Sequence, residues 1–535
     1  MRYSITFVVL CTAYLRLSPH IVEVAEAKLE NMLRENFRVS LVEKVASLKY
    51  NYIENQDSWD LISRVCKEHE KQCTNAFSQL FDMVALIINV LGILFVLLMQ
   101  VWWTAVFIVL ISVPLFLIAL KAGKASYEAS RMAQKYYRRV SYLSEVLNGR
   151  EAVEERALFQ YSGRVNDKYR SQYEKFRKVR FRVNLKWFAK AKLSGIITAF
   201  LSSVIIVILV FPVRSGKLTI GLFIAIAGNV ISLIQSLSWQ MPKYVDGLAK
   251  NKEYLVDLTS LVKLQGKAEY LDKPCKTPVS VESLEFKNVS FKYPGTDRFI
   301  LKGMNFKIEE GKHYAFVGIN GAGKTTITKL ITGLYEDFTG EILINNLSIK
   351  NYSQSQLKSM FSVVYQDFAK FYISLKDNVA LGDVNGCSND RINEALDIID
   401  LKEAAEHLPN GLNSNLGKIN EDGVDISGGQ WQRTAMARAI VSPASLRVLD
   451  EPTAAIDPIE ETKLYKKFKQ MSQGKTAVIV THRLGSAKIA DKIVVLDKGK
   501  IVQIGTHDEL INKDGKYKEM YEAQSKWYKV IDEKV

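Results

Sequence analysis

Four long apolar runs dominate the first half of the chain. They occupy residues 83–101, 104–120, 193–213 and 218–241. Each run is close to the roughly 20 residues that a helix needs to cross the hydrocarbon core of a bilayer. The runs form two pairs with minimal turns, an arrangement that buried helices of soluble folds rarely show. The pattern predicts four membrane-spanning helices.

The turns between these runs also suit a membrane boundary. Trp102 and Trp103 separate the first pair, and tryptophan favours the interface between lipid and water. The second pair is separated by the polar stretch 214–217, whose glycine suits a reversal of the chain. Pro114 is expected to kink the second helix.

The N-terminal segment is apolar but short. Residues 5–17 are interrupted by Thr12 and Arg16, and the core of a signal peptide is one alternative. No clear small-residue cleavage site follows, and a polar helical pattern continues over 21–49. We therefore expect the end of a membrane helix that extends into the cytoplasm.

Most of the positive charge lies between the two pairs of apolar runs. The chain has 535 residues and a net charge of +15, and residues 121–192 hold 19 Lys or Arg against 7 Asp or Glu, a net charge of +12. Basic loops beside membrane spans stay in the cytoplasm. Nucleic-acid binding needs a basic face with base-contacting residues on a folded module, and is not expected here. The helical periodicity of 122–190 predicts helices that project into the cytoplasm.

The second half of the chain has a different pattern. Its length predicts a separate core, and short β-rich runs alternate with helical ones, which is typical of an α/β domain with added antiparallel strands. The expected strands lie at 289–293, 313–317, 342–344, 448–449 and 477–481, with a hairpin around 497–500. The predicted organisation is a membrane domain over 1–255, a linker with little regular pattern over 256–280, and an α/β domain over 281–535. Five scattered cysteines indicate neither a disulfide framework nor a zinc site.

A glycine-rich loop follows the strand that ends at Val317 and precedes a helix, which is the context of a phosphate-binding P-loop. Its glycines let backbone N–H groups converge on phosphate, and Lys324 is expected to reach the terminal phosphates of a nucleotide while Thr325 ligates Mg²⁺. The loop consists of Gly318, Ile319, Asn320, Gly321, Ala322, Gly323, Lys324, Thr325 and Thr326.

Two acidic residues stand at the end of a later apolar strand. Asp450 suits the Mg²⁺ shell, and Glu451 can polarise the water that attacks the nucleotide. Shortly before this strand, a Ser-Gly-Gly-Gln stretch resembles the signature motif of ATP-binding cassette (ABC) transporters. It consists of Ser427, Gly428, Gly429 and Gln430.

This resemblance covers residues 281–535 and implies further roles. Tyr293 resembles the aromatic residue that stacks on adenine. Gln366 resembles the Q-loop glutamine, which contributes to catalysis and to the metal site. Asp457 resembles the D-loop aspartate, and His482 resembles the switch histidine that contacts the γ-phosphate. The implied cofactors are ATP and Mg²⁺. The implied assembly is a dimer, of two copies or with a related half-transporter, in which the signature residues close over the partner's nucleotide. Arg447 and Trp431 depart from the family's usual residue types.

The membrane half resembles exporter-type transporters less specifically, through stretches 145–149 and 215–221. Such domains have six helices, so the first helix is apparently missing, and five crossings leave the N-terminus outside. Short coupling helices are expected near 52–64 and 148–157.

The interpretation is an all-α transmembrane domain followed by an α/β P-loop cassette, in a multi-pass protein of a bacterial plasma membrane with the cassette in the cytoplasm. A soluble cassette ATPase and a regulatory subunit are the alternatives, which the membrane spans and the complete motif set disfavour. The residues after the signature, through Arg433, are similar to those of bacteriocin and other peptide exporters. The expected substrate is a peptide, and a lipid or a hydrophobic drug stays open.

Overall fold

The computed structural model describes residues 2–67, 69–100, 136–149, 152–216, 218–236, 240–266, 277–419, 421–451 and 474–532, together with residues 106, 117, 121, 125, 133, 275 and 467. The chain divides into two compact units. The helical unit contains 1–45 and 60–264, and the cassette unit contains 46–59 and 265–535.

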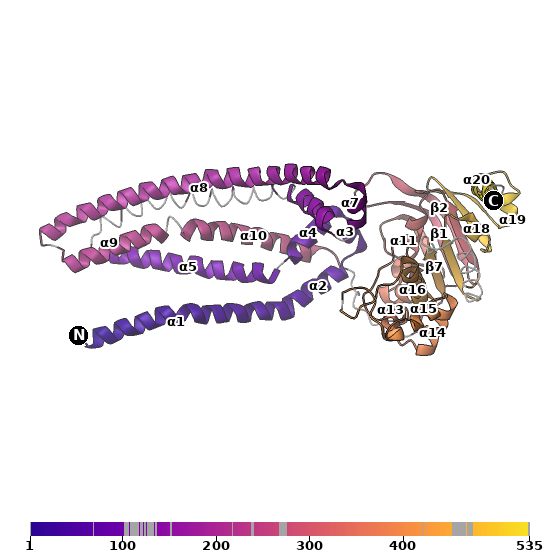
Figure 1. The fold of residues 1–535 in the computed structure, drawn as a ribbon, viewed down its shortest axis with the longest axis horizontal. Helices are drawn as coiled ribbons and strands as arrows, with labels where there is room; N and C mark the ends of the chain where they lie inside the picture. The colour runs from indigo at the N-terminus through magenta and orange to yellow at the C-terminus, as the bar shows by residue number, and fades with distance from the viewer. Residues whose placement is uncertain are drawn as a thin grey trace. The chain divides into compact units, whose positions relative to one another are not determined.

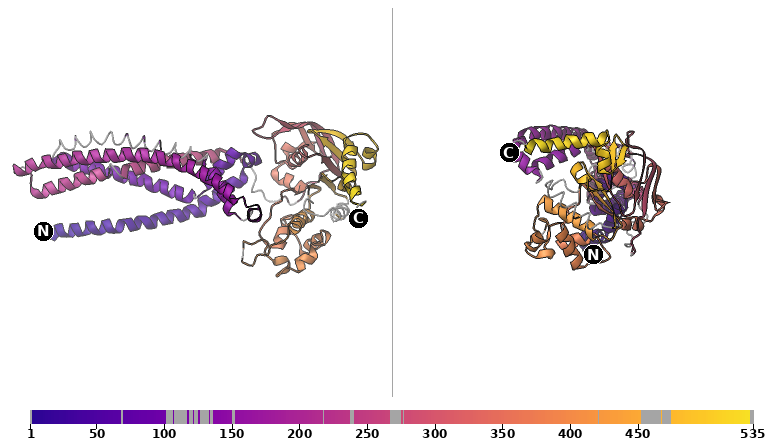
Figure 2. Two further views of the ribbon diagram at one scale, coloured as in Figure 1. Left: turned by 45° about the horizontal axis from the view of Figure 1, so that its top comes forward. Right: turned by 90° about the vertical axis from the view of Figure 1, so that its right-hand side faces the viewer.

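The helical unit is built from long helices that run side by side (Figures 1 and 2). Helix α5 packs against α10, and α8 packs against α9. Leu86, Leu209, Ile226 and Val230 are buried where these helices meet. The helices are α1 (Arg2–Met32), η1 (Leu33–Phe37), α2 (Arg38–Ser47), α4 (Gln56–Cys66), α5 (His69–Gln100), α7 (Val153–Phe159), α8 (Ser162–Arg214), α9 (Ile220–Gln235) and α10 (Met241–Lys263).

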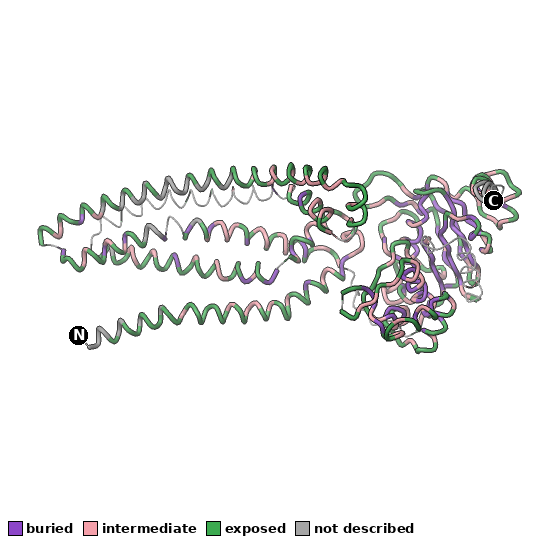
Figure 3. The backbone as a smooth tube through the Cα atoms, viewed as in Figure 1, coloured by how far each residue is buried: buried purple, intermediate pink, exposed green. Residues whose placement is uncertain are grey.

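Helix α5 exposes apolar side chains along most of its length (Figure 3). Within the described residues, His69–Val96 is the one helix both long and apolar enough to cross a membrane, and only 11% of its most apolar window is buried. A core helix of a soluble protein buries such side chains. The shorter helix Ile220–Ser232 is also apolar.

The bounds of the helices test several predictions for the helical unit. Helices α1 and α2, joined by η1, form one continuous helical segment over the predicted stretch 5–17 and over 21–49 as far as Ser47. The reversal at 214–217 lies between α8 and α9, and Gly216 there has φ of +72°. The predicted run 104–120 lies outside the described residues except for two positions. The prediction of an irregular linker over 256–280 was wrong in its first part, because α10 continues to Lys263.

The cassette unit contains two sheets. A four-stranded antiparallel sheet has the order β2-β1-β4-β5, and a six-stranded sheet has the order β10-β9-β3-β8-β7-β6. The second sheet is parallel except for its terminal hairpin β9-β10. The strands are β1 (Ser283–Lys292), β2 (Phe299–Glu309), β3 (His313–Gly318), β4 (Thr339–Ile344), β5 (Leu347–Ser348), β6 (Phe361–Val364), β7 (Leu446–Asp450), β8 (Thr476–Val480), β9 (Lys492–Asp497) and β10 (Lys500–Gly505).

Each predicted strand is confirmed, and β2, β5 and β6 are additional. Strands β3, β7 and β8 are buried at every position, as expected for parallel strands that are covered on both faces. The helices of this unit are α3 (Tyr50–Glu54), α11 (Lys324–Ile331), α12 (Gln354–Met360), α13 (Leu375–Ala380), α14 (Asn389–Ile398), α15 (Lys402–Glu406), α16 (Gly428–Val441), α18 (Leu484–Ala487), α19 (His507–Ile511) and α20 (Lys516–Asp532), with 3₁₀ turns η3 (Ile349–Asn351) and η4 (Gly411–Asn413).

Candidate functional site

The predicted P-loop connects β3 to α11 at the carboxyl edge of the parallel strands. Gly321 and Gly323 have φ of +80° and +105°, a region that side chains disfavour. A Cβ atom on Gly318 would lie 2.4 Å from the carbonyl oxygen of Leu496, so this glycine lets the loop pack against the neighbouring strand β9. The three glycines therefore fix the path of the backbone before the helix begins.

The side chain of Lys324 lies inside the loop. It is 5% exposed, and its Nζ donates hydrogen bonds to the carbonyl oxygens of Gly318 at 3.0 Å and Ile319 at 3.4 Å. The same nitrogen lies 3.9 Å from Oε1 of Glu451. Burial lowers the pKa of Lys324, and the charges of Glu451 and Asp450 oppose that shift. The loop thus surrounds one positive charge with backbone oxygens and acids.

Replacing Gly323 by alanine is expected to weaken ATP binding about tenfold or more. The new Cβ atom would lie 2.6 Å from Leu301 Cδ2, at a φ that alanine strongly disfavours, so the loop must shift. Binding of labelled ATP to the purified chain measures the effect. Gly474→Ala is the matched control, because Gly474 has φ of +82° and no atom near its added Cβ, and it precedes β8 at the opposite edge of the sheet. Equal loss in both variants would contradict a specific role of the loop.

Asp450 ends β7 beside the start of α11. Its side chain is fully buried, and Oδ1 accepts a hydrogen bond from Thr325 Oγ1 at 3.4 Å. Oδ2 is buried and has no hydrogen-bond partner among the described residues. Burial raises the pKa of Asp450 to about 6; the Thr325 hydrogen bond opposes the shift, and the charge of Glu451 adds to it.

This pair has the chemistry of a magnesium site. Carboxylate and hydroxyl oxygens are ligands that Mg²⁺ accepts beside substrate phosphates, and a bound cation stabilises the charged carboxylate. The buried, unpartnered oxygen of Asp450 fits such an ion. Gln366, the third predicted ligand, is exposed just after β6.

Glu451 and His482 follow the carboxyl ends of neighbouring strands β7 and β8. Oε1 of Glu451 lies 3.2 Å from Nδ1 of His482, and its backbone N–H donates to the carbonyl oxygen of Val480 at 2.9 Å. Glu451 has φ of +49°, an unfavourable value for a residue with a side chain, and such strain often accompanies functional sites. Gln524 in α20 donates a hydrogen bond to the carbonyl oxygen of His482 at 2.6 Å. The parallel sheet therefore brings the carboxylate, the imidazole and the P-loop lysine together.

The predicted signature stretch begins α16. Ser427 is its N-cap. Ser427 Oγ accepts from the backbone N–H of Gln430 at 3.2 Å, and the backbone N–H of Ser427 donates to Gln430 Oε1 at 2.8 Å, which is a reciprocal capping box. Ser427 and Gly428 are exposed, whereas Gly429 and Gln430 are half-buried. The helix starts at Gly428. An exposed helix N-terminus suits an anionic group.

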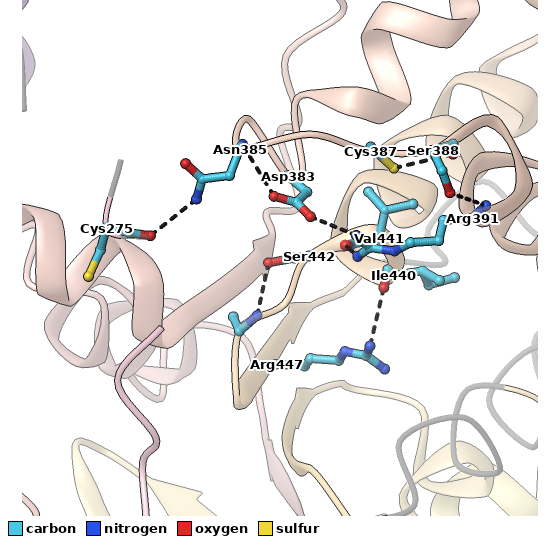
Figure 4. Close-up of polar contacts among 11 residues, drawn as sticks. Cys275, Asp383, Asn385, Cys387, Ser388, Arg391, Ile440, Val441, Ser442 and Arg447 are labelled. Carbon is cyan, nitrogen blue, oxygen red and sulfur yellow. Dashed lines mark hydrogen bonds and ion pairs between the residues drawn. The ribbon is translucent and has the colours of Figure 1, made fainter. Parts of the chain in front are cut away.

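Arg447, one of the two unusual residues, lies at the other end of the same helix (Figure 4). It is buried in β7, and its Nη2 donates to the carbonyl oxygen of Ile440 at 3.2 Å. Arg391 in α14 donates to the next carbonyl oxygen, that of Val441, and also pairs with Asp383 at 2.7 Å. The last carbonyl groups of a helix carry partial negative charge, so both guanidinium groups stabilise the C-terminus of α16.

Trp431, the second unusual residue, is 1% exposed. It lies in an apolar cluster with Leu416, Ala435 and Met436, and its ring meets that of Tyr372 edge-on at 6.0 Å. The tryptophan therefore anchors the first turn of α16 rather than facing a nucleotide.

Tyr293, the residue predicted to stack on adenine, lies beside the P-loop helix. Tyr293 lies just after β1, and its hydroxyl is 2.9 Å from Thr326 Oγ1 of the P-loop helix. Asp457 lies outside the described residues. Sequence reasoning missed Lys329 and Tyr335, which surround Tyr293, because no motif marks them. Nor did it single out Tyr50 and Glu54 of α3, although a coupling helix was expected to begin near residue 52.

The fold and the loop define a P-loop ATPase attached to membrane helices. The ABC transporter family model matches residues 301–454, and the model of the ABC transporter transmembrane region matches residues 2–237. The subtilin transport ATP-binding protein SpaT of Bacillus subtilis is 30% identical over 494 residues, which cover 92% of this chain and 79% of that protein. The chain therefore belongs to the ABC transporter family.

Other relatives carry different names. An ATP-dependent lipid A-core flippase of Shewanella frigidimarina is 29% identical over 507 residues, covering 91% of this chain and 80% of that protein. A bacterial Atm1-family ABC exporter with ATP bound shares the fold, with a TM-score of 0.77 and 22% identity over 96% of this chain and 90% of that chain. The predicted fold class is confirmed. The chain is an ABC-type ATPase that binds ATP and couples its hydrolysis to membrane transport, and half-transporters of this kind work as dimers.

Proposed function

We propose that the chain is a half-transporter that exports a peptide across a bacterial plasma membrane, as a homodimer with two shared sites for ATP and Mg²⁺. One observation carries the ATPase part of the proposal: the P-loop lysine, two acids and a histidine converge at one edge of a parallel sheet. Oε1 of Glu451 lies 3.9 Å from Nζ of Lys324 and 3.2 Å from Nδ1 of His482. This is the arrangement that phosphoryl transfer to water requires.

In this mechanism each residue has one task. Lys324 binds the terminal phosphates, and the backbone N–H groups of the P-loop orient them. Glu451 accepts a proton from the attacking water. His482, held 3.2 Å from that carboxylate, contacts the γ-phosphate. Thr325 and Asp450 would hold Mg²⁺, with Gln366 completing the ligands, and the ion when bound neutralises charge on the phosphate oxygens.

The exposed signature residues support the dimer. Ser427 caps a helix whose N-terminus faces solvent within its own unit. Helix N-termini attract phosphate, and we assign Ser427, with Gly428, Gly429 and Gln430, to the nucleotide bound by a second copy. Asp457 is assigned to the contact between the two cassettes, and Tyr293 to the adenine ring.

The export of a peptide rests on sequence similarity to peptide exporters. Relatives named for transport of subtilin and of nisin match 92% and 93% of the chain, and the residues after the signature resemble those of peptide exporters. The basic stretch 121–192 supports a cytoplasmic location for that loop and for the cassette. The relatives named as lipid A-core flippases favour a second candidate, a lipid substrate.

The test is ATP hydrolysis by the purified chain in lipid nanodiscs, with subtilin, nisin or lipid A added. Stimulation of about twofold or more by a peptide but not by lipid A is the expected result. Stimulation by lipid A alone would overturn the peptide proposal in favour of a flippase. Hydrolysis only after addition of a related half-transporter would overturn the homodimer.

A further inference from the structure

The short helix α3 packs against the cassette core beside the P-loop helix. The ring of Tyr50 meets that of Tyr335 edge-on, with centroids 5.4 Å apart and planes at 83°. Tyr335 is 3% exposed and also contacts the rings of Phe291 and Tyr293. Residues 46–59 belong to the same compact unit as the cassette. An aromatic cluster thus joins α3 to the residue that we assign to adenine.

Two ion pairs attach the ends of residues 49–54 to the rest of the cassette unit. The segment supplies the lysine in one pair and the glutamate in the other. Lys49 Nζ lies 3.0 Å from Oε2 of Glu336, and Oε1 of Glu54 lies 3.1 Å from Lys329 Nζ. Both pairs are partly exposed, and the Glu54 side chain is 40% exposed. Both are lysine–glutamate pairs. They differ in the other residues that the lysine side chains contact.

Lys329 also contacts the aromatic cluster. Its Nζ lies 5.3 Å from the ring centroid of Tyr50, 5.5 Å from that of Tyr293 and 5.9 Å from that of Tyr335. A cation within about 6 Å of a ring is attracted to its electron-rich face. Burial lowers the pKa of Lys329, but the hydrogen bond to Glu54 and the tyrosines outweigh this effect and raise it, so the side chain stays charged.

Tyr293 is held between this cation and the P-loop. Its hydroxyl lies 2.9 Å from Thr326 Oγ1, three residues before Lys329 on α11. Two residues of α11 therefore contact Tyr293, whose ring also meets the rings of Phe291 and Tyr335. One of the two, Lys329, is bound in turn by Glu54 of α3.

We propose that Lys329 is a positioning residue for Tyr293, and that its ion pair with Glu54 makes the affinity for the adenine base depend on α3. This inference rests on the proposed role of Tyr293. When α3 is seated, Glu54 holds the cation against the ring, and the ring is fixed for stacking. When the pair is broken, the cation turns toward solvent and the ring gains freedom, so that affinity for the base falls.

The experiment compares binding of ATP with binding of inorganic tripolyphosphate, which offers phosphates and no base, to the full chain in nanodiscs. Glu54→Gln and Lys329→Met are each expected to weaken ATP binding about two- to fivefold, which is what loss of an aromatic–cation contact amounts to. Tripolyphosphate binding is expected to stay unchanged. Lys49→Gln is the matched control, because it breaks the other ion pair of α3, which does not reach Tyr293, and it is expected to change neither.

Exchanging the charges of Glu54 and Lys329 distinguishes a positioning role of Lys329 from a simple attachment of α3. The double variant Glu54→Lys with Lys329→Glu can restore an ion pair but places a carboxylate beside the ring of Tyr293. If Lys329 positions the ring through its charge, ATP affinity stays low in this variant. Full recovery of ATP affinity would overturn the proposal, as would an equal loss in Lys49→Gln or a loss of tripolyphosphate binding in Lys329→Met.

Tyr293→Ala separates the adenine role of Tyr293 from the positioning role of Lys329. If this variant loses ATP affinity while Lys329→Met does not, the adenine role holds and the positioning role of Lys329 is wrong. If Tyr293→Ala keeps the affinity for ATP, the adenine role itself is wrong and the inference is overturned with it.

Discussion

Glu451→Gln is expected to lower the rate of ATP hydrolysis by about 100- to 10,000-fold, the range that a positioned general base contributes. Glutamine keeps the shape of the side chain and its contact with His482, but it cannot accept a proton from water. ATP binding is expected to persist, because Lys324 and the P-loop are unchanged. The measurement is steady-state phosphate release by the chain in nanodiscs, with ATP binding measured in parallel.

The control for this variant is Glu394→Gln. Glu394 is exposed on α14, and replacing it removes the same charge from the cassette far from the P-loop in sequence. It is expected to hydrolyse ATP at the normal rate. Residual activity within tenfold of normal in Glu451→Gln would show that another group activates the water. Loss of ATP binding would instead show that Glu451 shapes the loop.

Trp431→Ala is expected to destabilise the cassette by about 3–5 kcal/mol, the usual cost of truncating a buried aromatic residue. The side chain is 1% exposed and fills the cluster under the first turn of α16. The cavity left behind loosens the helix that presents Ser427. The melting midpoint of the cassette is expected to fall by roughly 10 °C, which calorimetry of the full chain with and without ATP can detect.

The matched control is Trp59→Ala. Trp59 is 46% exposed. Substitutions at exposed positions usually change stability by only about 0.5 kcal/mol or less, and the same is expected here. An unchanged melting midpoint for Trp431→Ala would contradict the structural role of this tryptophan. A fall in hydrolysis without a fall in stability would place Trp431 in the nucleotide site after all.

The strands that carry the site could be predicted because their patterns are local. Strands β3 and β8 are short, mostly apolar runs, and β7 is apolar apart from Arg447 and Asp450. Such runs can be recognised from the sequence. The additional strand β2 alternates between exposed and buried positions from Gly303 to Ile308, but two successive exposed residues, Lys302 and Gly303, interrupt the alternation in the middle of the strand. The linker was misplaced at its start: Leu258 and Leu261 continue the helical spacing of α10, and the helix runs to Lys263.

The P-loop, the two acids and the signature helix could be predicted from the sequence alone, since each depends on residues that are neighbours in the chain. A glycine permits a positive φ at its own position, and a serine caps the helix that follows it. Two contacts are visible only in the folded protein: Glu54 meets Lys329, and Arg447 caps α16 from the strand that ends at Asp450. These contacts depend on how strands and helices pack, which no spacing along the chain encodes. Glu54 and Lys329 are 275 residues apart, and packing alone places one beside the other.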